Sequence, residues 1–100
     1  MKDPAQILAV DRLIHEPARL LIVTILSTAE KADFLFLLKE TRLTKGNLST
    51  HLSKLETAGY IEIEKTYKGK VPLTLCSLTT AGQNAFEKYR NQVNKFLKQT

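Results

Sequence analysis

One segment, TKGNLSTHLSKLETAGYIEIEK at residues 44–65, constrains the fold of this chain more than any other. Leu48, Leu52 and Leu55 recur at steps of four and three residues, which is the spacing of a single apolar stripe on a helix. Gly59 follows them and is suited to ending that helix in a left-handed conformation. The residues after Gly59 alternate between apolar and polar, as in a half-buried strand. The segment therefore predicts a helix with one buried face that turns directly into a strand.

Shorter helices are predicted before this segment. Apolar spacing indicates a helix over about 4–14, and the Glu16-Pro17 break starts a second, almost wholly apolar helix over about 18–27. Asp33 can cap a third helix that runs to about residue 41. A connection of only a few residues separates it from the next helix, which Thr44 can cap, so the two form a helix-turn-helix.

A hairpin and a long helix are predicted after it. The glycine in YKGKVP, residues 67–72, marks the hairpin tip, and LTLCSL alternates as a returning strand. Thr79 can cap a final helix over about 79–99. The expected fold is mainly α with a small β-hairpin (α+β), a winged helix-turn-helix in a single domain over residues 1–100.

The charge of the chain is unevenly distributed. The formal net charge is +5, yet residues 1–38 carry a net charge of −1. Residues 39–71 and residues 72–100 each carry +3. A basic excess confined to two segments predicts an anionic partner for at least one of them.

In a winged helix-turn-helix, the helix over about 44–58 is the recognition helix and its polar face enters the DNA major groove. Between Lys45 and Leu55 the sequence contains no carboxylate, whereas an ordinary solvated face carries both charges. An exposed polar face alone would also fit simple solvation. The candidate DNA-binding residues on this helix are Lys45, Asn47, Ser49, Thr50, His51 and Lys54.

The hairpin adds lysines beside the recognition helix. Lys65, Lys68 and Lys70 surround Gly69 in a wing over about 65–72. Lysines at such a tip suit contact with DNA phosphates or with the minor groove. Alternatively, they protect an edge strand from aggregation.

The motifs ARLLIVTIL, ADFLFLLKETRLTKGNLSTHLSKLETAGYIEIEK and LTTAGQ resemble those of short stand-alone winged helix-turn-helix transcriptional regulators of the MarR/ArsR-like superfamily. The resemblance covers nearly the whole chain. It implies a prokaryotic regulator whose recognition helix reads the major groove, whose wing touches the adjacent backbone and whose terminal helices form a homodimer. Relatives usually carry arginine-rich wings, whereas Val71, Leu73 and Cys76 occupy that region here.

The last helix has an apolar stripe that fits this dimer. Its members step by three, four and three residues, close to a coiled-coil seam. Pairing with a second copy, together with apolar residues near the N-terminus, would bury the stripe. The expected dimer interface comprises Ile7, Val10, Ile14, Phe86, Tyr89, Val93, Phe96 and Leu97.

Other classes of function fit the sequence less well. No catalytic triad, carboxylate pair or phosphate-binding loop is recognisable, so an enzyme is not expected. A metal sensor would depend on His15, His51 and Cys76, which lack paired ligand spacing, so no metal or other cofactor is expected. A winged helix used for protein interaction is the nearer alternative, and nothing in the residues indicates a small-molecule effector.

The single cysteine and the lack of a long apolar run indicate a cytoplasmic protein without a membrane span.

Overall fold

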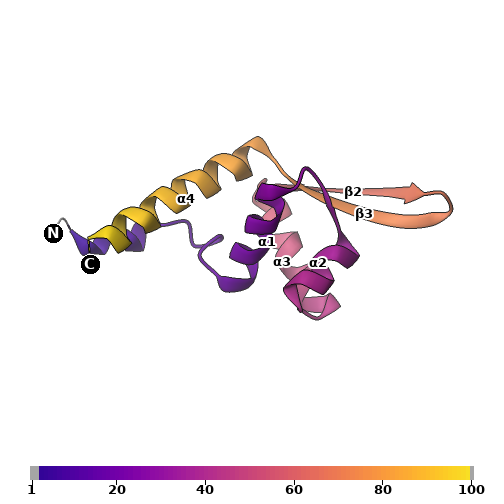
Figure 1. Ribbon diagram of the computed structural model, residues 1–100, viewed down its shortest axis with the longest axis horizontal. Coiled ribbons are helices and arrows are strands. Elements are labelled where there is room, and N and C mark those ends of the chain that lie inside the picture. Colours follow the sequence, from indigo (N-terminus) through magenta and orange to yellow (C-terminus); the bar gives the residue numbers. More distant parts are fainter. Residues whose placement is uncertain (1–2, 100) are drawn as a thin grey trace.

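The computed structural model describes residues 3–99 as a set of short helices, a small sheet and a long terminal helix (Figure 1). In chain order the elements are η1 (Pro4–Ala9, a 3-10 helix), α1 (Pro17–Thr28), β1 (Ala32–Asp33), α2 (Phe34–Thr41), α3 (Lys45–Thr57), β2 (Ile61–Lys68), β3 (Val71–Leu78) and α4 (Thr80–Lys98). The strands form one antiparallel sheet in the order β1-β3-β2. The predicted winged helix, mainly α with a β-hairpin, is confirmed.

The molecule is elongated, with extents of 58 × 26 × 21 Å. Helices α1, α2 and α3 form a central body, the β2–β3 hairpin projects from one end, and α4 projects from the other beside η1 (Figure 1). No helix in residues 3–99 combines the length and the apolar character needed to cross a bilayer.

The core lies where the three helices meet the sheet. Ile22 and Val23 of α1 are fully buried there, as are Leu48 and Leu55 of α3. The leucine stripe predicted from the sequence therefore faces inward, and its burial leaves the opposite face of α3 to solvent.

Three of the helices begin with a side-chain cap that the sequence predicts. Asp33 accepts a hydrogen bond from the Phe36 N–H at 2.8 Å, Thr44 accepts one from Asn47 N–H at 3.1 Å, and Thr79 accepts one from Gly82 N–H at 3.0 Å. Each cap satisfies a backbone donor that the first turn leaves without an intrahelical partner.

The expected helix over 4–14 is wrong, because it ends at Ala9. The carboxylate of Asp11 accepts the backbone N–H groups of Leu13 and Ile14, at 2.8 and 3.2 Å, and so folds this segment into a turn. The turn directs Ile14 into the core, where it is fully buried.

The sheet is larger than the sequence predicts. The hairpin strands continue to Lys68 and Val71, so the turn is only Gly69-Lys70, with Gly69 at a φ of 66°. A positive φ at the first turn residue suits glycine and a tight two-residue hairpin. Strand β1, which pairs with β3, is only two residues long, too short to give a sequence pattern.

Helix α1 is capped by Glu16 before Pro17. Its carboxylate accepts the N–H groups of Ala18 and Arg19, at 3.0 and 2.9 Å. Partial burial is the largest single influence and raises the pKa of Glu16, but these two hydrogen bonds and the charges of His51 and Arg19 together outweigh it, so the pKa lies below the ordinary value of 4.5.

Helix α4 is held against the end of the α3–β2 connection by close backbone packing. Gly82 is buried, and a Cβ atom there would overlap the carbonyl oxygen of Tyr60 and lie 2.9 Å from its carbonyl carbon. The same carbonyl accepts the N–H of Thr79 at 3.0 Å. Only glycine allows α4 to approach this closely.

Replacing Gly82 with alanine should therefore lower the free energy of unfolding by about 1 to 3 kcal/mol, because two backbone segments must separate. Gly46→Ala is the matched control, since a Cβ atom at that residue would meet nothing within 4 Å. Alanine at residue 46 should leave stability unchanged or raise it by up to about 1 kcal/mol. Urea denaturation of both variants measures the difference, and equal stabilities would contradict the close contact.

The cap on α1 should make stability depend on pH. Because the folded pKa of Glu16 is lowered, its contribution is fully present above the unfolded value of 4.5 and is lost as pH falls through the folded value. Glu16→Gln should lose about 1 kcal/mol at pH 7 and approach wild-type stability at pH 3. Glu30→Gln, which changes an exposed carboxylate beyond the other end of α1, is the control. Urea denaturation at the two pH values would contradict this role if the Glu16 variant kept a constant deficit.

Candidate nucleic-acid interface

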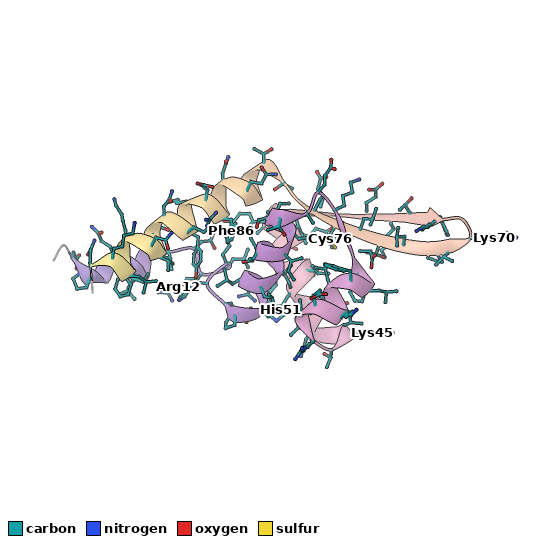
Figure 2. The ribbon with its side chains drawn as sticks, viewed as in Figure 1. Arg12, Lys45, His51, Lys70, Cys76 and Phe86 are labelled. Carbon is teal, nitrogen blue, oxygen red and sulfur yellow. The ribbon has the colours of Figure 1, made fainter. Side chains whose placement is uncertain are left out.

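The exposed face of α3 is lined by short polar and basic side chains. Among the predicted DNA-binding residues, Lys45, Asn47, Ser49, Thr50 and Lys54 are all exposed. Figure 2 shows Lys45 at the outer edge of the three-helix body, away from both α4 and the core. The Thr50 hydroxyl donates to the Gly46 carbonyl at 2.9 Å, so it can still accept a hydrogen bond from outside the helix.

His51 is placed differently from its neighbours. It is half-buried on the flank of α3 that faces the start of α1, and its Nδ1 lies 3.1 Å from Nη1 of Arg19. The same Nδ1 lies 3.7 Å from Oε2 of Glu16. One ring nitrogen of His51 is therefore engaged within the chain.

Glu16 and Arg19 were not predicted from the sequence as neighbours of α3. A charged residue inside the almost wholly apolar segment ARLLIVTIL was the available signal, because such a residue needs a partner. Its partner lies 32 residues away, and local spacing carries no information on that contact.

The strand register separates the wing residues onto two faces. Lys65 pairs with Thr74 and Tyr67 with Pro72, so these four share the face that bears the buried Ile61. A groove between this face and α3 is lined by Lys65 from the hairpin and by Ser53 and Glu56 from α3. Lys68 pairs with Val71 on the opposite face, and Lys70 lies in the turn (Figure 2).

The charged side chains of the wing are also divided between the two faces of the hairpin. Glu62 and Glu64 alternate with Lys65, so both carboxylates lie on the face away from α3. Glu64 is paired there with Lys31 at 2.9 Å, and this hydrogen bond raises the pKa of Lys31. The hairpin face beside α3 bears lysine but no carboxylate.

The wing tip is also apolar. Tyr67 is 70% exposed and Val71 is 64% exposed, one on each face of the hairpin. An exposed aromatic ring next to lysines is a common feature of surfaces that contact nucleic acid, but Tyr67 was not among the predicted DNA-binding residues.

The residues expected at a dimer interface fall into two groups. Val10, Ile14, Phe86 and Tyr89 are buried within the chain itself, and Tyr89 donates or accepts a hydrogen bond with His15 at 2.8 Å. These four are therefore not available to a partner. The members that retain accessible surface are Ile7, Val93, Phe96 and Leu97.

The residues of the metal-sensor alternative lie at separate sites. His15 contacts Tyr89, His51 contacts Arg19, and Cys76 is buried in the sheet. Burial raises the pKa of Cys76 to about 11, which disfavours the thiolate that a metal would need. Within residues 3–99, no cluster of three or more His, Cys, Asp or Glu side chains is suited to a metal ion.

Comparison with known proteins agrees with this arrangement. Residues 18–97 match the family described as a winged helix DNA-binding domain. The chain is 35% identical over 79 residues to the uncharacterized protein MJ0432 of Methanocaldococcus jannaschii, an alignment that covers 78% of this chain and 85% of that protein.

Solved structures show the same fold. A transcriptional regulator homologue from Pyrococcus horikoshii superposes with a TM-score of 0.87 and 26% identity, covering 98% of this chain and 96% of the other. An ArsR family transcriptional regulator superposes with a TM-score of 0.59 and 18% identity, covering 99% and 97%. The matched family is a DNA-binding domain, which agrees with the expectation that the chain is not an enzyme. The chain belongs to the winged helix DNA-binding domain family.

Proposed function

We propose that this protein is a sequence-specific transcriptional regulator that binds double-stranded DNA as a homodimer. The observation that carries the proposal is the pairing of two surfaces. The exposed face of α3 offers donors and lysines, and the hairpin face beside it bears lysine without a carboxylate.

Helix α3 is suited to the major groove, which admits one α-helix. Asn47 and Lys54 can bond base edges or phosphates, while Ser49 and Thr50 are short enough to allow close approach. Lys45 lies in the first turn, the end by which recognition helices usually enter the groove.

The wing would then lie against the backbone beside α3. Lys65 is on the face toward α3, whereas Lys70 and Lys68 lie at and beside the turn. Lysine contacts to phosphate supply affinity and orientation but little sequence information. Preference for particular base pairs should therefore come mainly from α3.

Dimerisation is supported by the shape of the molecule and by its remaining apolar surface. The C-terminal half of α4 projects beyond the central body, with η1 beside it (Figure 1). Phe96 and Ile7 line a groove between these two helices. A second copy related by a two-fold axis would cover this surface and present two recognition helices to one pseudo-palindromic site.

The wing lysines should contribute to binding on every DNA sequence. Lys68→Ala with Lys70→Ala should reduce the slope of log K against log salt by about 2, because two phosphate contacts are lost. Lys88→Ala with Lys98→Ala removes the same charge from α4 and should change the slope much less. Fluorescence anisotropy over a salt series, on upstream and random DNA, measures both slopes.

Two outcomes would count against this assignment. Equal effects of the two double variants would show that only net charge matters. A wild-type protein that binds no DNA at low salt would instead favour the protein-interaction alternative.

The end of α4 should control assembly. The wild-type chain should sediment at twice its monomer mass of 11.3 kDa, and Phe96→Asp should shift it toward monomer by placing a charge in the interface. Asn91→Asp adds the same charge to an exposed residue on α4 and should leave the dimer intact. Analytical ultracentrifugation separates the species, with circular dichroism as the check of folding. A monomeric wild-type protein at high micromolar concentration would exclude the proposed dimer.

A further inference from the structure

Arg19 joins the connection before α1 to the recognition helix. Its Nε donates to the Leu13 carbonyl at 2.6 Å, and its Nη1 lies 3.1 Å from Nδ1 of His51. Nη1 also lies 3.7 Å from Oε2 of Glu16, and the Arg19 side chain is only 12% exposed. Two guanidinium nitrogens, Nε and Nη1, therefore have partners within the chain, and Nη1 reaches α3.

The chemistry of this contact determines where the His51 proton lies. Arginine carries only donors and stays protonated in proteins, so in the Arg19–His51 bond the imidazole nitrogen must be the acceptor. A nitrogen that accepts cannot carry a hydrogen. Nδ1 of His51 is therefore the unprotonated nitrogen, and the ring hydrogen is on Nε2.

The position of His51 on α3 indicates what Nε2 can contact. His51 follows Asn47 by four residues and precedes Lys54 by three, so the three side chains share one flank of the helix. The centre of the exposed face is occupied by Thr50 and Ser53. In a major groove the flanks of a helix lie nearest the phosphate backbones, and the His51 side chain retains 20% of its exposure there.

We propose that Arg19 is a positioning residue of the DNA interface, which holds His51 as the Nε2–H tautomer so that Nε2 donates to a DNA phosphate oxygen. This inference rests on the proposed function, because it requires α3 to lie in the major groove. Glu16 supports the arrangement electrostatically, because its Oε2 lies 3.7 Å from the same Nη1 that contacts His51. Arg19 itself does not contact DNA.

The tautomer can be measured without DNA. In ¹⁵N-edited NMR spectra of the imidazole, wild-type His51 should show a protonated Nε2 and an unprotonated Nδ1 at pH 8. Arg19→Met, which keeps an apolar stem and removes the donor, should give a mixture of tautomers. Arg12→Met is the matched control, because Arg12 is an exposed arginine in the segment before α1 (Figure 2). An unchanged tautomer in the Arg19 variant would overturn the positioning role.

Binding affinity then tests the connection to DNA. His51→Asn keeps an acceptor near the Nδ1 position, since Asn Oδ1 is reached by the same two side-chain torsions, but it removes the Nε2 donor. Arg19→Met and His51→Asn should each weaken binding by roughly threefold to tenfold, and the double variant should lose no more than either one. Arg12→Met should bind as wild type does.

The possible results distinguish a failure of the proposed Arg19–His51 role from a failure of the proposed DNA-binding function. Additive losses, or a reduced salt slope in Arg19→Met, would show that Arg19 contacts phosphate directly and would overturn the proposal. Full affinity in His51→Asn would show that the contact only stabilises the fold. If wild-type protein binds no DNA while NMR finds the expected tautomer, the proposed function fails and the Arg19–His51 geometry stands.

Discussion

Tyr60 is the last residue of the connection between α3 and β2. It links three parts of the molecule that position the candidate nucleic-acid interface. Its hydroxyl donates to the carboxylate of Asp11, and this hydrogen bond is the main cause that raises the pKa of Tyr60 to about 12. Its carbonyl accepts the N–H of Thr79 and packs against Gly82 at the start of α4. Helix α3, the turn before α1 and helix α4 are therefore held together by contacts of one residue. The direction of α4 relative to α3 follows from that junction.

Most of the fold could be predicted because its signals are local. The Asp33, Thr44 and Thr79 caps each bind a backbone group within three residues, and the leucine stripe of α3 is read from a single segment. The prediction of a helix over residues 4–14 was wrong, and the cause is an equally local interaction. The apolar spacing continues to residue 14, but Asp11 competes for the backbone donors and favours a turn.

The candidate site was predictable in its composition but not in its arrangement. Exposure of Lys45 and Lys54 follows from the buried stripe on the opposite face of α3. The division of the wing into a lysine face and a carboxylate face follows from the strand register, which the sequence placed only roughly. The contact of His51 with Arg19 joins two helices, so neither helix alone could indicate it.

The close packing of Gly82 also sets a mechanical property of the protein. Helix α4 extends 16 residues beyond that glycine, so its far end lies about 24 Å from the point of contact. A rotation of about ten degrees at the contact would move the far end by about 4 Å, which is comparable to the rise of one base pair. The close backbone contact at Gly82 therefore restricts rotation of α4 relative to the central body. In a dimer joined through the ends of α4, this contact would determine the distance between the two α3 helices.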